Sequence, residues 1–432
     1  MRQRLVRIGS IALLSLWTAG LLSAETVPFS KAIDAALKHS GTMAIAAAEE
    51  AHARASLAQA RDAYIPQAIV GSGLGASFGF PLSLEGSAPS ILNFNTQSMV
   101  LNFPQREYLR SARFRWQAAS TQTLDRRNQV ILDTATAYFE LDQALSKLKV
   151  LNDEGEAAHH AEFITSQRVN QGIDSQLDSK KAQLNSARVR MRLAEVQANV
   201  DVLREHLSKL TGIAAADFVT DPESLPGFPE VRQDTDLGAL AVANSPAVKT
   251  ADQNAQSEEF RARAEHKQWM PAVDFAAQYA MLARYNNYAQ FYNSFQRNNA
   301  SIGVSIRFPF FSASQRAVAE AADADVIKAK KEADLARNQA IEDTLKQQRS
   351  LTQLAAAAEV AKLEYEVANT GVDAAQSRLE TGNATSRDVE NARLDATDRY
   401  AAYLDAQLEM EKAQMQLMRL TGEIYDWSSV QK

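Results

Sequence analysis

The sequence predicts a mostly α-helical protein with a small β part, in which long coiled-coil helices and short strands occur in two copies of one unit. Three observations support this fold class. Residues 105–169 contain no proline and only one glycine, Gly155. Apolar residues in this stretch recur at alternating steps of three and four, which is typical of a helix packed along another helix. Finally, amphipathic strands precede this stretch, and the same order of elements returns in the second half of the chain.

The N-terminus has the pattern of a secretory signal peptide. Three arginines precede an apolar run from Ile8 to Leu22, and the small residues Ser23 and Ala24 follow it. The alternative is a membrane anchor, but about fifteen apolar residues fall short of the roughly twenty that a spanning helix needs. We therefore predict a signal peptide over residues 1–24 and export of the remaining chain.

Composition excludes several classes of function. The 432 residues include no cysteine, so disulfides, thiolate metal sites and a cysteine nucleophile are excluded. Removal of the signal peptide would change the formal net charge from −6 to −9, because its three arginines are lost. This acidic balance gives no indication of nucleic-acid binding. No later segment is apolar over a sufficient length for a transmembrane helix, so any membrane crossing would have to use β-strands.

An alanine-rich helix is predicted at the start of each unit, over about 42–63 and 246–268, and it ends where a proline stops it. Two strands with alternating apolar and polar residues follow, at about 73–80 and 97–103 in the first unit and 273–279 and 301–308 in the second. Between the second pair lies an aromatic cluster that we interpret as a membrane-interface girdle or a loop rim: Tyr285, Tyr288, Phe291, Tyr292 and Phe295.

A long helix follows each pair of strands. The first is predicted from Gln105 to about Val169 and would be roughly 100 Å long at 1.5 Å per residue. Its apolar seam comprises Leu124, Ile131, Thr134, Tyr138, Leu141, Leu145 and Leu148. The corresponding seam of the second long helix comprises Leu351, Leu354, Ala358, Ala361, Tyr365, Ala368 and Val372. No compact domain needs helices of this length, so an elongated body is expected.

Each long helix is predicted to turn at a glycine, Gly172 or Gly382, and to return as a second helix. The returning helices end at Gly212 and Gly422, each preceded by threonine, because glycine readily adopts a left-handed cap. The first returning helix has the seam Val196, Val200, Leu203, Leu207 and Leu210.

Four matched segments indicate that the chain is an internal duplication. Two recur at an offset of 205 residues and two at 210: Tyr64-Ile65-Pro66 with Trp269-Met270-Pro271, Phe103-Pro104 with Phe308-Pro309, Gly172 with Gly382, and Leu210-Thr211-Gly212 with Leu420-Thr421-Gly422. We therefore predict two repeats, residues 25–231 and 232–432. A proline-containing connector at residues 221–229 joins them.

Four strands per chain cannot form a transmembrane barrel alone, because about eight is the lower limit. Open strand edges cannot face lipid, so strands that span a membrane would have to form one oligomeric barrel with other chains. Helical hairpins hanging from that barrel would close into a hollow tube. The alternative is a soluble coiled-coil protein in which two small β-hairpins serve as packing elements.

The segments Leu132-Asp133-Thr134-Ala135-Thr136-Ala137-Tyr138-Phe139 and Arg168-Val169-Asn170-Gln171-Gly172, with the Leu-Thr-Gly helix ends, resemble the TolC family of outer-membrane efflux proteins. The resemblance covers nearly the whole mature chain. It implies a homotrimer whose chains each contribute four strands to an outer-membrane barrel and their helices to a periplasmic tunnel. It also implies a periplasmic adaptor and an inner-membrane pump as partners. The turn Phe103-Pro104-Gln105-Arg106 departs from the family by lacking its usual glycines, whereas Phe308-Pro309-Phe310-Phe311-Ser312 fits better.

The predicted function is therefore a passive exit duct in the outer membrane, serving a tripartite efflux or type I secretion system. A periplasmic coiled-coil adaptor and a structural protein without a barrel are the alternatives. No phosphate-binding loop, nucleophile elbow or metal-binding histidine cluster occurs, so neither an enzyme nor a cofactor or metal site is predicted. The exported substrate cannot be identified from these features.

The predicted functional residues lie at and near the turns. Gly172 and Gly382 should form the periplasmic tips and the docking surface for the adaptor. Asp178 and Asp388 each stand six residues after a turn glycine. The resemblance matches Asp388 to one of two aspartates that ring the periplasmic aperture in the family, whereas the second falls on Asn391. The alternative is that Asp178 and Asp388 cap their helices, since each lies three residues after a serine or threonine.

Overall fold

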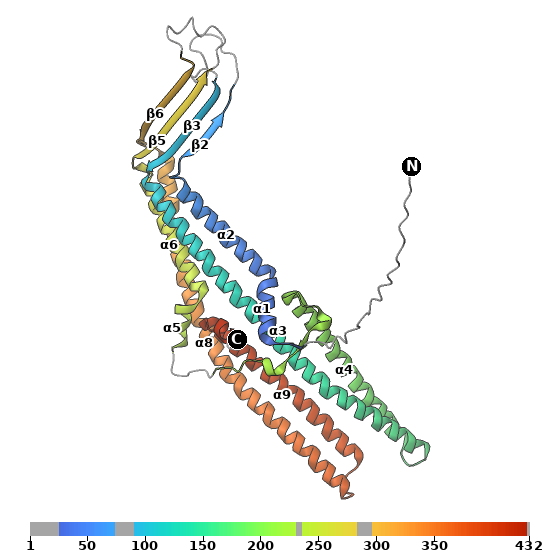
Figure 1. Cartoon of the computed structure of the whole chain (residues 1–432). Coiled ribbons are helices and arrows are strands. Elements are labelled where there is room, and N and C mark those ends of the chain that lie inside the picture. Colours follow the sequence, from blue (N-terminus) through green and yellow to red (C-terminus); the bar gives the residue numbers. More distant parts are fainter. Residues whose placement is uncertain (1–25, 74–89, 230–235, 283–295, 430–432) are drawn as a thin grey trace, which may run out of the picture.

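The computed structural model describes residues 26–73, 90–229, 236–282 and 296–429. The molecule is elongated, with a four-stranded sheet at one end and two helical hairpins at the other (Figure 1). Helices α3 (Phe103–Asn170) and α4 (Gln176–Thr211) form the first hairpin. Helices α8 (Ala313–Glu380) and α9 (Ser386–Thr421) form the second. The predicted fold class, mostly α with a small β part, is confirmed.

Local sequence explains where the long helices begin and end. The Asn102 side chain accepts a hydrogen bond from the Gln105 amide at 2.9 Å and so caps α3, with a proline in the first turn. Ser312 caps α8 in the same way through the Gln315 amide at 3.3 Å. Both helices are 68 residues long. Most of the residues in their predicted apolar seams are buried or half-buried, with Ile131, Tyr138 and Leu141 fully buried. Leu124 is the exception at 45% exposed, so the buried part of the first seam begins after it.

Shorter helices accompany the hairpins. Helices α2 (Gly41–Asp62) and α6 (Pro246–His266) agree with the two predicted alanine-rich helices, and α6 continues into η3 (Lys267–Trp269). Seven further elements within the described ranges were not predicted from the sequence: α1 (Phe29–His39), α5 (Leu237–Asn244), α10 (Ile424–Ser429), η1 (Ala215–Asp217), η2 (Pro222–Ser224) and the paired strands β1 (Thr26–Val27) and β4 (Val219–Thr220). These are short or depend on packing against α3.

The main core lies where the start of the described chain, the connector and the C-terminal helix meet α3. The Phe29 ring makes edge contacts with Tyr138 and Trp427, at centroid distances of 5.5 and 5.6 Å. The Tyr138 hydroxyl donates to the Val27 carbonyl at 2.7 Å and accepts from the Asp221 amide at 2.8 Å. One residue of the long helix therefore holds both β1 and the connector.

The sheet is antiparallel, in the order β2 (Gln67–Gly71), β3 (Ser90–Leu101), β5 (Ala272–Leu282), β6 (Asn298–Arg307). Strand β3 begins earlier than the predicted residue 97, because pairing with β5 extends it through asparagines that have a low intrinsic strand preference. Strand β2, the first strand of this sheet, directly follows Pro66. Most of the strand predicted over 73–80, and the aromatic cluster at 285–295, lie outside the described residues.

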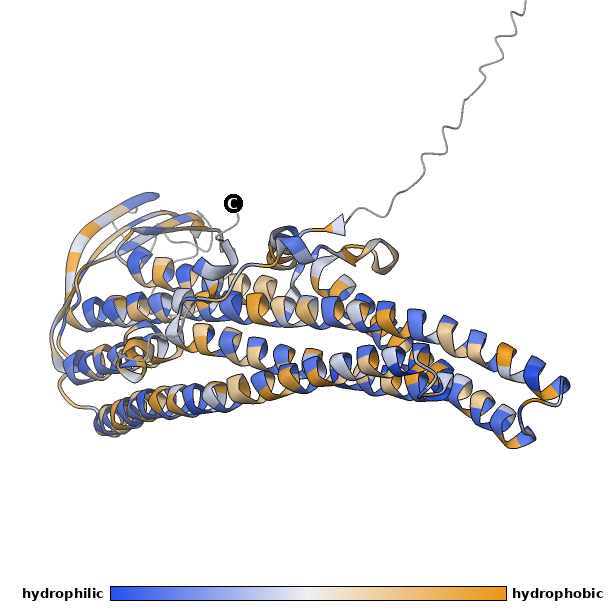
Figure 2. Cartoon of the chain, turned by 90° about the horizontal axis from the view of Figure 1, so that it is seen from below, coloured by the Kyte–Doolittle hydropathy of each residue, from blue (hydrophilic) through white to orange (hydrophobic). Residues whose placement is uncertain are grey.

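One face of this sheet is apolar and the other polar. Ile302 of β6 pairs with Ala277, which pairs with Thr96, so these side chains share a face. Val304 pairs with Phe275 on that same face, whereas the alternate β6 residues Ser301, Gly303 and Ser305 lie on the other face. Figure 2 shows this alternation along the strands. Ile302 and Val304 are 77% and 63% exposed, so the sheet presents an apolar surface that the described chain does not cover.

None of the helices within the described ranges combines the length and the apolar character needed to cross a membrane.

Candidate functional site at the hairpin tips

The two turns predicted at glycine lie at the end of the molecule furthest from the sheet (Figure 1). Gly172 has φ of 75° and Gly382 has φ of 76°, a left-handed conformation that glycine adopts without strain. In the first tip the Ile173 amide donates to the Arg168 carbonyl at 2.9 Å. In the second the Asn383 amide donates to the Arg378 carbonyl at 2.8 Å. These bonds occupy carbonyls that the helix ends would otherwise leave unpaired.

Each tip continues into a helix with a reciprocal cap. The Ser175 hydroxyl accepts a bond from the Asp178 amide at 3.2 Å, and the Asp178 carboxylate accepts one from the Ser175 amide at 3.3 Å. Thr385 and Asp388 make the same pair of bonds, at 3.4 and 2.8 Å. The capping geometry expected for both aspartates is therefore present. It does not test their role at an aperture.

The tips also contact one another. The Arg387 guanidinium donates to the Asp178 carboxylate at 2.8 Å and thus joins α9 to α4. The Ser175 hydroxyl and this arginine lower the pKa of Asp178 to about 2, the hydroxyl having the larger effect. The pKa of Asp388 is also lowered, mainly by the Thr385 amide and then by its hydroxyl. Sequence reasoning missed Arg387, although an exposed arginine next to a capping aspartate was a usable signal.

Asp388 and Asn391 are exposed near the start of α9, and Asp178 is half-buried. The structure brings Asp178 into contact with the second hairpin, but it describes one chain. A ring of carboxylates needs several copies, so the aperture role of these three residues stays a prediction.

Further ion pairs fasten the two hairpins along their length. Arg192 of α4 binds Asp398 of α9 at 2.6 Å, and Lys412 of α9 binds Glu140 of α3 at 2.8 Å. These pairs are partly exposed, and each contributes little stability alone. Together with the tip contact they connect α9 to both helices of the first hairpin.

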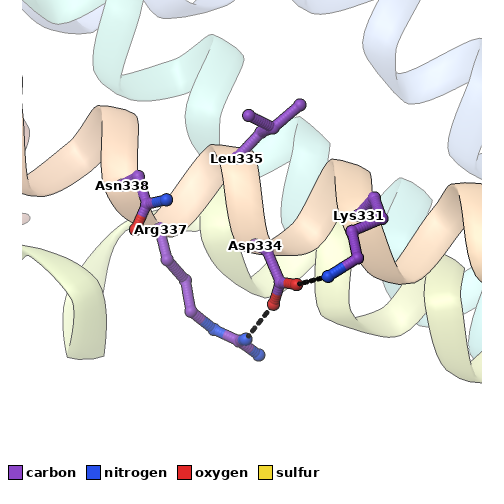
Figure 3. A pocket seen from close by; sticks show the side chains of 5 residues that line it. All are labelled: Lys331, Asp334, Leu335, Arg337 and Asn338. Carbon is purple, nitrogen blue, oxygen red and sulfur yellow. Dashed lines mark hydrogen bonds and ion pairs between the residues drawn. The ribbon is translucent and has the colours of Figure 1, made fainter.

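A groove on α8 offers no catalytic or binding chemistry. Figure 3 shows a shallow groove whose lining side chains all come from α8. Its charges are already paired, since Asp334 binds Lys331 at 3.1 Å and Arg337 at 3.3 Å. Among the residues that the structure describes, no group of three or more histidine, aspartate or glutamate side chains could hold a metal ion.

Solved structures of outer-membrane proteins share this architecture. The outer membrane protein VceC of Vibrio cholerae superimposes with a TM-score of 0.73, at 18% identity, over 91% of this chain and 96% of that one. The outer membrane channel CmeC of Campylobacter jejuni gives 0.75, at 14% identity, over 93% and 89%. At such low identities these matches establish the fold, which is that of a helical-hairpin body carrying an amphipathic sheet.

The sequence model of the outer membrane efflux protein family matches residues 32–213 and 237–423, so the chain belongs to this family. This confirms the predicted family, the location in the outer membrane and the expectation that the protein is not an enzyme. The cobalt-zinc-cadmium resistance protein CzcC of Cupriavidus metallidurans is 24% identical over 302 residues, which are 70% of this chain. The match spans 65% of CzcC, which is less than two thirds of its length.

Proposed function

We propose that this protein is the outer-membrane exit duct of a tripartite efflux or secretion system, with an adaptor and an inner-membrane pump as partners. The observation that carries the proposal is the sheet, which has one exposed apolar face and two unpaired edges, β2 and β6, within the described chain. An adaptor or a structural coiled-coil protein would have no use for such a sheet. Lipid is the solvent that suits its apolar face.

Membrane fractionation tests this proposal. We expect the full chain in the outer-membrane fraction, extractable only with detergent, as a species whose migration changes on heating. Recovery in the soluble periplasmic fraction would contradict the proposal and favour the adaptor or structural alternative.

Homotrimer formation would satisfy the edges of the sheet, because β6 of one chain can pair with β2 of the next. The hairpins also carry exposed apolar rows. Helix α4 exposes Leu177, Leu184 and Met191 at seven-residue steps, and α8 exposes Val360, Leu363 and Val367 at steps of three and four. Both spacings are typical of helix–helix seams. Covering these seams with neighbouring copies would close the hairpins into the predicted tunnel.

The tips at Gly172 and Gly382 are the proposed docking surface for the adaptor, because they lie opposite the sheet (Figure 1). Cysteine at Gln171 or Asn383 should cross-link to a periplasmic partner, and the chain has no native cysteine to interfere. A matched control is cysteine at Asn299 on β6, which should not cross-link to it. The reverse pattern would invert the proposed orientation.

The proposed aperture role of Asp388 is tested by single-channel recording of Asp388→Ala in planar bilayers. Three carboxylates at a constriction would focus the field and attract cations. We therefore expect the variant to lose cation preference and block by trivalent cations. Unchanged conductance, selectivity and block would leave Asp388 as a helix cap only. Asn391→Asp and Asp178→Asn extend the test to the other two candidates.

The relative CzcC is named as a cobalt-zinc-cadmium resistance protein, and on this basis we propose divalent metal cations as the exported substrate. Deletion of the gene should then lower resistance to cobalt, zinc or cadmium salts, and the parent gene should restore it. Unchanged metal resistance would remove the basis for this substrate class and leave the duct proposal intact.

A further inference from the structure

One acidic side chain in the hairpins is buried without a hydrogen bond of normal geometry. Glu154 of α3 is 8% exposed, and neither carboxyl oxygen has a hydrogen bond of normal geometry within the described part of the chain. Burying a carboxylate is costly unless it is paired, and such groups tend to take up a proton instead. In the described ranges, no other acidic side chain has an oxygen that is both buried and unpaired.

Glu154 lies where three helices meet. Helix α4 packs against α3 beside Glu154, since a Cβ at the neighbouring Gly155 would lie in ordinary contact with Leu193 at 3.5 Å and Val189 at 3.8 Å. Val189 is only 1% exposed, so the contact excludes water on this side. Helix α9 of the second hairpin also reaches Glu154, through Thr397.

The charged groups that face Glu154 are Arg192 from α4 and Asp398 and Glu390 from α9. Arg192 is engaged elsewhere, because it binds both carboxylate oxygens of Asp398 at 2.6 and 3.4 Å. The positive charge of Arg192 is therefore shared with Asp398, and Asp398 and Glu390 are both negative. The ionised form of the Glu154 carboxyl is therefore energetically unfavourable between the two hairpins.

Burial is the largest cause that raises the pKa of Glu154, and Asp398 and Glu390 raise it further, against the opposing effects of Arg192 and Thr397. A raised carboxyl pKa means that the packed state binds the proton more tightly than the separated state. Below the ordinary glutamate pKa, about 4.3, both states are protonated and nothing is lost. As the pH rises through the pKa of the packed state, the packed arrangement loses stability relative to the separated one.

We propose that Glu154 is a proton-controlled latch between the two hairpins. With a neutral carboxyl, α9 packs against α3 and α4, and with an ionised carboxyl the separation of α9 from the first hairpin becomes easier. This proposal depends on the proposed function in one respect, namely that the hairpins would line the duct. Its test needs no transport, so its failure is distinguishable from failure of the duct proposal.

Hydrogen exchange of the full-length protein in detergent tests the latch, with peptides covering residues 150–160 and 388–400. Parent, E154Q and E156Q are compared at the same pH, so the intrinsic pH dependence of exchange cancels. E154Q keeps the size of the side chain and removes its ionisation. E156Q is the matched control, because Glu156 is exposed two residues away on the same helix.

At pH 8 we expect exchange of both peptides to be slower in E154Q than in the parent. The expected factor is about tenfold for each unit by which the pKa of Glu154 in the packed state exceeds its pKa in the separated state. At pH 4 the parent and E154Q should exchange alike, and E156Q should follow the parent at both values. Equal exchange of parent and E154Q at pH 8 would overturn the proposal. An equal slowing by E156Q would also overturn it, by showing a general effect of charge.

Discussion

At the scale of single residues, Tyr138 and Asp178 show how polar groups hold distant segments together. The Tyr138 hydroxyl joins residues that are 111 and 83 positions away in the sequence. Asp178 caps its own helix and also binds Arg387, 209 positions away. The cap was predictable from the serine three residues earlier. The contact with Arg387 was not, because it depends on how the two hairpins pack.

Tyr138→Phe should destabilise the protein by about 1–3 kcal/mol, because it leaves the buried Val27 carbonyl and Asp221 amide without their shared partner. Thermal denaturation in detergent measures the effect. The control is Tyr279→Phe, which removes an exposed hydroxyl bonded to Asn298 at 3.2 Å and should change the midpoint little. Equal effects of the two variants would contradict a structural role for the Tyr138 bonds.

The contact between the tips should depend on pH through Asp178. Its pKa is lowered in the folded state, so the contribution to stability is present above the ordinary aspartate pKa, about 3.9, and is lost as the pH falls through about 2. Hydrogen exchange of residues 171–180 should therefore be faster in Asp178→Asn than in the parent at pH 5. The difference should shrink toward pH 2. A constant difference across this range would show that titration of Asp178 is not involved.

At the scale of elements, the long helices, their glycine turns and the second pair of strands were predictable because each follows from a local pattern. The seam from Ile131 to Leu141 and the cap at Asp388 are examples. Helix α5 was missed because only eight residues leave too short a window for a period. Helix α1 was missed because its burial depends on contacts between Phe29 and residues far along the chain.

The left-handed glycines that follow α3 and α4 provide a paired test of glycine. Gly172 and Gly212 have nearly the same φ, 75° and 74°. A Cβ at Gly212 would meet the His39 ring at 2.8 Å, whereas at Gly172 it would meet nothing within 4 Å. Gly172→Ala should therefore cost about 1–2 kcal/mol from the backbone alone, and Gly212→Ala should cost more.

Thermal denaturation of the two variants measures this difference. The added mutation His39→Ala should recover part of the loss in Gly212→Ala and none of the loss in Gly172→Ala. Recovery in neither case would show that the contact with His39 does not limit substitution at Gly212.

At the scale of the whole molecule, an amphipathic sheet and two long hairpins lie at opposite ends of one elongated chain (Figure 1). Strand alternation predicted the apolar face of the sheet, and a period of three and four predicted the hairpin seams. The order of the strands was not predictable, since β3 pairs with β5 across the two halves of the chain. The division into repeats at residue 231 and the number of chains stay predictions, because a single chain tests neither.

We propose that this sheet is one part of a barrel shared between chains. It is tested most directly by the mass of the purified, folded protein in mild detergent, with the detergent contribution subtracted. We expect three times the mass of the mature chain, because three copies would leave no edge of β2 or β6 unpaired. A stable, folded monomer inserted in a membrane would contradict it.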